Sequence, residues 1–169
     1  IAPGLRLLPA AAFQWSDHRG LPRTRGEHVL VLLAAGSAVL RMPRSEVAAS
    51  PLLFVPAGTA FAWHPGPDAE GVVLLIGREL ADSAAAALPT RMIDATPDPA
   101  GFEELEAVLA ALAAEMLRAD AGARKAMEAQ LGRLAQRLSR TAAVGAGADD
   151  LADRFLALAG RELPRGRDL

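Results

Sequence analysis

The sequence predicts an α+β protein, in which a small all-β unit of short strands precedes a helical segment. Short apolar runs recur through residues 5–76 and are separated by glycine and proline, a pattern typical of a β-sandwich or barrel. From Gly101 onward, apolar residues instead recur every three or four positions, which is the period of a helix. The stiff segment Thr96-Pro97-Asp98-Pro99 separates the two patterns, so we end the β-unit, residues 1–98, there.

The most continuous strand-like sequence extends from Arg25 to Trp63. Val29, Val31 and Leu33 face one side of its first strand, and the residues between them face the other. A helix is excluded because glycine and proline would interrupt it every few residues. Residues 43–50 are polar and are expected to interrupt the sheet. The predicted strands are Leu5–Leu8, Ala12–Trp15, His28–Leu33, Ala38–Met42, Leu52–Val55, Phe61–Trp63, Val72–Ile76 and Met92–Ala95, with a short helix at Glu79–Leu88.

Residues 99–143 are predicted to form a helical hairpin. Two helices, each with an apolar stripe, are separated only by Asp120-Ala121-Gly122, and such a short loop makes them antiparallel. Residues 143–148 (AVGAGA) are expected to be a flexible hinge. Asp149 then begins a third helix that extends to Leu163, within a last unit formed by residues 144–169. The stripe residues are Phe102, Leu105, Leu109, Leu112 and Met116 in the first helix, and Met127, Leu131, Leu134 and Leu138 in the second.

The composition narrows the class of protein. The 169 residues carry a formal net charge of −2, so the chain alone is a poor candidate for nucleic-acid binding. It contains no cysteine, which excludes disulfides and thiolate metal sites. No apolar run approaches the roughly 20 residues of a membrane span, and the N-terminal residues lack the features of a signal peptide. These features favour a cytoplasmic protein without a membrane segment.

Three segments carry a resemblance to a known family. FVPAGTAFAW, followed by GPDAEGVVLLIG, resembles the second half of the cupin-type barrel of AraC/XylS-family transcription regulators. GARKAMEAQLGRLAQRLSR is similar to the helical segment that follows this barrel, and DDLADRFLALAGREL is similar to the first helix of the family's DNA-binding half. The resemblance implies a double-stranded β-helix barrel that binds an effector, helices that dimerise, and a DNA-binding half of which only the first helix is present.

Metal-dependent cupin enzymes, such as isomerases and dioxygenases, are the alternative. Their metal needs several imidazoles and a carboxylate, usually from a His-x-His pair with a nearby Glu and a later histidine. Around those positions this sequence has Arg23, Arg25 and Phe61, and a guanidinium group is not a metal ligand. The three histidines share no close spacing, and the sequence has no cysteine nucleophile, GxSxG motif or phosphate-binding loop. We therefore expect neither a metal or other cofactor nor enzymatic activity.

A small-molecule pocket is the remaining candidate site. Trp15, Phe61 and Trp63 are expected to form an aromatic wall, because a small barrel without a metal site has room for one ligand. Arg23 and Arg25 are positioned to bind a carboxylate with two parallel hydrogen bonds each. His28 is a further candidate ligand contact. The alternative interpretation is that the aromatic residues are ordinary core and that the arginines lie at a solvated edge.

Together these observations give one hypothesis. The chain is the effector-sensing and dimerisation part of an AraC/XylS-type regulator, and its barrel binds a small organic molecule, plausibly a carboxylate. A homodimer is expected to form through the helices from Phe102 to Leu138. DNA is expected to bind only through a C-terminal domain that this sequence lacks.

Overall fold

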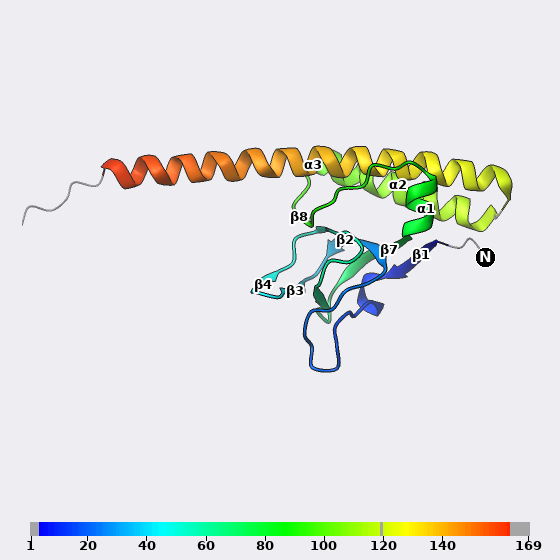
Figure 1. Cartoon of the computed structure of the whole chain (residues 1–169), viewed down its shortest axis with the longest axis horizontal. Helices are drawn as coiled ribbons and strands as arrows, with labels where there is room; N and C mark the ends of the chain where they lie inside the picture. The colour runs from blue at the N-terminus through cyan, green and yellow to red at the C-terminus, as the bar shows by residue number, and fades with distance from the viewer. Residues whose placement is uncertain (1–3, 119, 163–169) are drawn as a thin grey trace, which may run out of the picture.

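The chain folds into three layers, two of sheet and one of helix (Figure 1). The computed structural model describes residues 4–118 and 120–162. A five-stranded sheet lies in the middle, with a three-stranded sheet against one face and the helices against the other. All six strand pairings in these residues are antiparallel. The predicted α+β class, with antiparallel strands before helices, is therefore confirmed.

The five-stranded sheet has the order β1-β7-β2-β5-β8. Its strands, in that order, are Leu5–Pro9, Glu70–Gly77, Glu27–Ala35, Leu52–Val55 and Ile93–Ala95. All four residues of β5 are buried, because layers cover both faces of the sheet. This double burial explains why the sequence of β5 is continuously apolar rather than alternating.

The three-stranded sheet has the order β4-β3-β6, with strands Ser45–Ala48, Ala38–Met42 and Ala62–Pro65. The predicted polar interruption at residues 43–50 is wrong in part, because β4 lies within it. All four residues of β4 are exposed, so this edge strand has no apolar alternation from which to predict it. The described strands form two separate sheets, and the cupin-type barrel stays a prediction.

Two short elements also differ from the prediction. Ala12–Trp15 was expected to be a strand, but the chain forms a single 3₁₀ turn, η1 (Ala10–Ala12), followed by one isolated bridge at Trp15. The small alanines have little β-propensity, and the amide of Phe13 closes the turn on the carbonyl of Ala10 at 3.2 Å. Helix α1 (Arg78–Ser83) is shorter than expected, since Ala85 leaves the helical region with a φ of 47°.

The helices α2 (Pro99–Arg118) and α3 (Ala121–Glu162) run side by side (Figure 1). Asp98 Oδ1 accepts a hydrogen bond from the amide of Gly101 at 2.6 Å, and Asp120 Oδ1 accepts one from Ala123 at 2.7 Å. Each aspartate therefore caps an amide that the first helical turn leaves without a partner. An ion pair between Glu104 and Arg137 links the two helices.

The expected hinge at residues 143–148 is not a break, because α3 is continuous through it. Alanine is the strongest helix former, and each glycine costs only about 1 kcal/mol in a helix interior, so this composition weakens a helix without ending it. The expected third helix is thus the last third of α3, up to Glu162. The remainder of the predicted last unit, residues 163–169, lies outside the described residues.

The apolar stripes of α2 and α3 pack on the five-stranded sheet. Their buried residues form one cluster with the helix-facing side chains of the strands. The sheet therefore covers the stripe that was predicted to join two chains between Phe102 and Leu138. This stripe is therefore not available to a second chain. The buried stripe residues are Leu105, Leu109, Leu112, Met127, Leu131, Leu134 and Leu138, with Phe102 and Met116 partly buried against them.

Candidate functional site

Two of the predicted aromatic residues lie in the core between the sheets. Phe61 and Trp63 are 1% and 0% exposed, and both belong to the cluster that fills the space between the three-stranded and five-stranded sheets. The ring of Phe13 lies 5.8 Å from that of Trp63. These side chains serve as packing, as the alternative interpretation of the sequence proposed.

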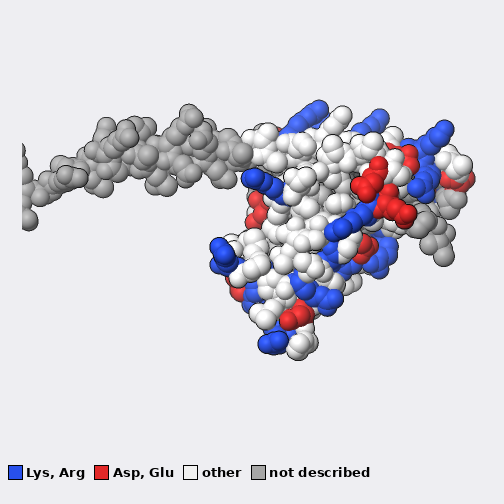
Figure 2. Space-filling model, viewed as in Figure 1, with Lys and Arg blue, Asp and Glu red and all other residues white. Residues whose placement is uncertain are grey.

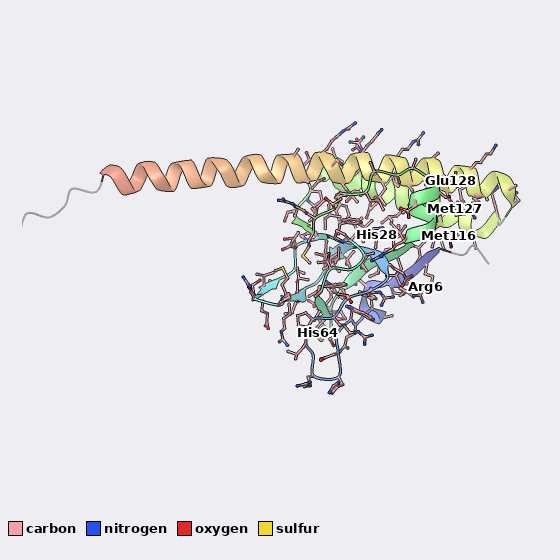
Figure 3. All side chains as sticks on the ribbon, in the orientation of Figure 1. Arg6, His28, His64, Met116, Met127 and Glu128 are labelled. Atoms are coloured by element: carbon pink, nitrogen blue, oxygen red, sulfur yellow. The ribbon has the colours of Figure 1, made fainter. Side chains whose placement is uncertain are left out.

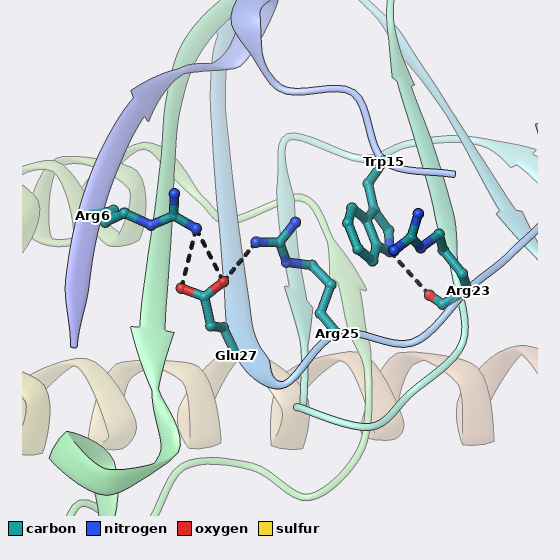
Figure 4. Close-up of polar contacts among 5 residues, drawn as sticks. All are labelled: Arg6, Trp15, Arg23, Arg25 and Glu27. Carbon is teal, nitrogen blue, oxygen red and sulfur yellow. Dashed lines mark hydrogen bonds and ion pairs between the residues drawn. The ribbon is translucent and has the colours of Figure 1, made fainter. Parts of the chain in front are cut away.

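Trp15 lies at the edge of this core and is stacked against two arginines (Figure 4). The guanidinium carbon of Arg23 is 4.1 Å from the indole centroid, and that of Arg25 is 4.2 Å from it. The indole ring also lies 6.5 Å from the ring of Phe61. The negative face of an indole attracts cations, so Trp15 holds both predicted arginines close together.

The backbone fixes this arrangement. Trp15 and Arg23 form isolated antiparallel bridges to Trp63 and Phe61, respectively, so the two segments line up along one edge of the small sheet. The indole Nε1 of Trp15 also donates a hydrogen bond to the carbonyl of Arg23 at 3.0 Å. The structure therefore brings together four of the six predicted site residues, Trp15, Arg23, Phe61 and Trp63, and stacking adds Arg25.

Glu27 connects Arg25 to Arg6 (Figure 4). Arg25 donates to Glu27 Oε1 at 2.6 Å, and Arg6 lies 3.2 Å from the same oxygen. Burial favours a raised pKa for the Glu27 carboxyl, but the hydrogen bond from Arg25 and the charges of both arginines outweigh it. The pKa of Glu27 is therefore below its ordinary value, and the carboxylate neutralises Arg25.

The two arginines differ in exposure and in the partners that their guanidinium groups already have. The Arg25 side chain is 13% exposed and paired with Glu27, although its buried Nε has no hydrogen-bond partner. Arg23 is exposed, and its guanidinium makes no hydrogen bond or ion pair within the residues that the structure describes. Of the two arginines stacked on Trp15, Arg23 is the one that is exposed and not paired with a carboxylate within the described residues.

His28 lies apart from this group, on the opposite face of the five-stranded sheet (Figure 3). Its ring stacks on Phe54 at 6.1 Å, and its Nδ1 accepts a hydrogen bond from the amide of Ala57 at 3.1 Å. Burial and the charge of Arg78 lower the pKa of His28, against the opposing effect of Asp82. His28 therefore does not lie with the predicted aromatic residues, because it and its neighbour Glu27 face opposite sides of β2.

Three hollows on the surface of the described residues lie away from this group. Three surface pockets are found between the helices and the segments that they cover, and none of them is lined by the six predicted residues. The space between the sheets holds apolar side chains from both layers. The Arg23–Trp15–Arg25 stack is therefore a site at the edge of the core rather than the wall of an enclosed cavity.

No group of three or more potential metal-ligating side chains is present in the described part of the chain. His28 and His64 project from opposite sides of the sheets (Figure 3).

In residues 4–118 and 120–162, no helix carries an apolar stretch that could cross a bilayer. Basic and acidic side chains are intermixed on the surface face that is coloured by charge (Figure 2).

No protein-family model matches the chain, and no curated protein is significantly similar to it.

Glu27 is a residue of this group that the sequence analysis did not predict. Its side chain pairs with Arg25, whereas its neighbour His28 stacks on Phe54 on the other face of the sheet. Arg25 and Glu27 carry opposite charges two residues apart, which is the signal for their pairing, although Arg25 precedes β2. Phe13, whose ring is 5.7 Å from the Arg25 guanidinium, gave no comparable signal because it follows an irregular turn.

Proposed function

We propose that this chain is the effector-sensing and dimerisation domain of a cytoplasmic AraC/XylS-type transcription regulator, without enzymatic activity. The resemblance of FVPAGTAFAW and of the two later helical segments supports the family. The order of the elements, antiparallel strands followed by paired helices, agrees with it. The proposal includes a cupin-type barrel, a small-molecule effector that binds to it, and a DNA-binding half of the whole regulator.

The observation that carries the ligand proposal is the stack of Arg23 on Trp15. A guanidinium group held against an aromatic ring is already ordered, so little conformational freedom is lost when it binds. Arg23 is exposed and unpaired among the described residues, whereas Arg25 already has a carboxylate. The effector is therefore an organic carboxylate whose charged end binds Arg23 and whose apolar part lies along Trp15.

A second copy of the chain is the other proposed partner. The stripe from Phe102 to Leu138 is covered by the sheet, so the dimer uses the outward faces of α2 and α3. Leu117, near the end of α2, is 88% exposed and is available for such a contact. Sedimentation of wild type and Leu117→Asp tests this, because a dimer that uses this face dissociates when a charge is placed in it. An unchanged molecular mass would remove this face from the interface.

Three probes of similar shape test the carboxylate site: phenylacetate, 2-phenylethanol and 2-phenylethylamine, which are anionic, neutral and cationic. Calorimetric titration is expected to show that phenylacetate binds at Arg23. Arg23→Gln removes the charge and is expected to lower that affinity about tenfold, the effect of one charge-assisted hydrogen bond. Trp15 fluorescence, measured in a Trp63→Phe variant so that only one tryptophan remains, should respond to the same titration.

Arg19→Gln is the matched control, because Arg19 is an exposed arginine of the same segment that does not stack on Trp15. It should bind phenylacetate as wild type does. Equal binding of phenylacetate to wild type and Arg23→Gln, or an equal loss in both variants, would contradict the proposed site.

A further inference from the structure

One of the three surface pockets lies between α2 and the five-stranded sheet, on the face opposite the arginine stack. It has a volume of about 310 Å³, within the range of roughly 300–1,000 Å³ that small-molecule sites occupy. We call it the α2 groove. It is lined by Leu7, Leu32, Ala34, Gly71, Val72, Phe102, Glu106, Leu109, Ala110 and Ala113.

The groove is hollow because small residues from the two layers face each other. Ala110 and Ala113 contribute only methyl groups from α2, and Ala34 does the same from β2. Gly71 cannot be replaced by a larger residue, since a Cβ there would lie 2.2 Å from the carbonyl oxygen of Leu32. The space is therefore built into the backbone and into the helix face.

Larger apolar side chains form the rest of the lining. Leu32 and Leu109 are 4% and 6% exposed and form its buried part, while Val72 is 37% exposed. Phe102 is partly buried against the same core cluster. Apolar surface that stays open to water is costly, so an apolar occupant would gain free energy here.

Glu106 is the only ionisable residue of the lining. Among the described residues it makes no hydrogen bond and no ion pair, although Glu104 and Glu115 on the same helix each pair with an arginine. An unpaired carboxylate beside an apolar groove is complementary to a molecule with an apolar body and a cationic end.

We propose that the α2 groove binds a small apolar molecule that carries an ammonium group, with its body against Leu109 and Phe102 and its charge near Glu106. This site is independent of the proposed carboxylate site, because it lies on the other face of the sheet and has the opposite charge. A ligand there contacts both α2 and the sheet, so it strengthens their packing.

The same three probes test this proposal on the whole chain, with calorimetry and methyl NMR of the leucine and valine side chains. 2-Phenylethylamine should bind more tightly than 2-phenylethanol or phenylacetate, and should shift the methyl signals of Leu109 and Val72. Glu106→Gln should lower the affinity for 2-phenylethylamine about fivefold, the effect of one solvent-accessible ion pair. The affinity for 2-phenylethanol should be unchanged by this substitution.

Glu103→Gln is the matched control, an exposed glutamate on α2 that does not line the groove, and it should bind like wild type. Ala113→Leu and Ala110→Leu each fill the groove and should abolish amine binding while the chain stays folded by circular dichroism. The proposal is overturned if 2-phenylethylamine does not bind saturably, if both filled variants still bind it, or if Glu106→Gln and Glu103→Gln behave alike. These outcomes are separate from the Arg23 test, which uses the anionic probe.

Discussion

The two faces of the five-stranded sheet are both apolar, yet they are filled differently. On one face, Phe61 and Trp63 of the small sheet region are fully buried against the strands. On the other face, α2 presents Ala110 and Ala113 to the same sheet and leaves the α2 groove. Large aromatic side chains close the gap between layers, whereas alanines across from a required glycine cannot. Apolar character thus determines which faces meet, and side-chain size determines whether space remains.

The largest effect is expected from opening the filled face. Trp63→Ala removes a fully buried side chain and should lower the free energy of unfolding by about 3–5 kcal/mol. Trp63→Phe should cost much less, because it retains most of the ring and removes the buried Nε1 that has no hydrogen-bond partner. Urea unfolding of the two variants checks this. If both variants lose the same free energy of unfolding, the ring of residue 63 does not contribute to packing as the structure indicates.

Replacing an alanine by leucine on each face of the five-stranded sheet tests whether one face is full and the other has room. Ala38 is 4% exposed in the core between the sheets, so Ala38→Leu overpacks that core and should destabilise the chain by about 1–3 kcal/mol. Ala113→Leu instead enters the groove and should change the stability by no more than about 0.5 kcal/mol. If thermal and urea unfolding show similar losses for both variants, the groove does not have room for a side chain.

The ion-pair network beside the filled face should contribute less. Glu27→Gln leaves the mostly buried Arg25 without its carboxylate and should cost about 1–2 kcal/mol, between the values for exposed and buried pairs. Arg6→Gln is the control, because Arg6 is 60% exposed, and it should cost under about 0.5 kcal/mol.

The same network has a pH signature with a definite sign. The folded-state pKa of Glu27 is below its ordinary value of 4.5, so its contribution to stability is present above pH 4.5 and is lost as the pH falls below it. Wild type should therefore lose more stability than Glu27→Gln on acidification from that pH. Parallel acid unfolding curves would contradict the assignment.

The smallest effect is expected on the helix-facing side, at His28. Its folded-state pKa lies below the ordinary value of 6.5, so the unfolded chain takes up the proton first as the pH falls. The stability that neutral His28 contributes is present above pH 6.5 and is lost as the pH falls below it. His28→Asn retains an acceptor for the Ala57 amide and should remove this step from unfolding curves measured at pH 7 and 5.5.

The elements that the sequence predicted well are those with a strong apolar period. The strands near Leu52 and Val72 and the helices around Leu109 and Leu134 appear where expected, because burial on a defined face requires that period. Strand β4 has no buried face, and the alanine–glycine stretch in α3 has no strong preference against helix. The local sequence therefore did not allow the secondary structure of these two segments to be predicted.

The candidate site was predicted less completely than the fold. The opposite charges of Arg25 and Glu27 indicate their pairing, although Arg25 precedes β2, and strand alternation separates His28 from Glu27. The stacking of Trp15 on Arg23 depends on two isolated bridges, to Trp63 in β6 and to Phe61 just before it, which are long-range contacts without a local signal. The α2 groove was beyond sequence reasoning, since it depends on which small residues face each other across two layers.

The continuity of α3 has a mechanical consequence. At 1.5 Å per residue, its 42 residues span about 63 Å, and the 20 residues of α2 cover about 30 Å of that length. The remaining half acts as a lever arm fixed at one end. A rotation of α3 by about 10° on the sheet would displace Glu162 by roughly 6 Å over that arm. The continuous helix therefore converts a change in its tilt on the sheet into a displacement at its far end.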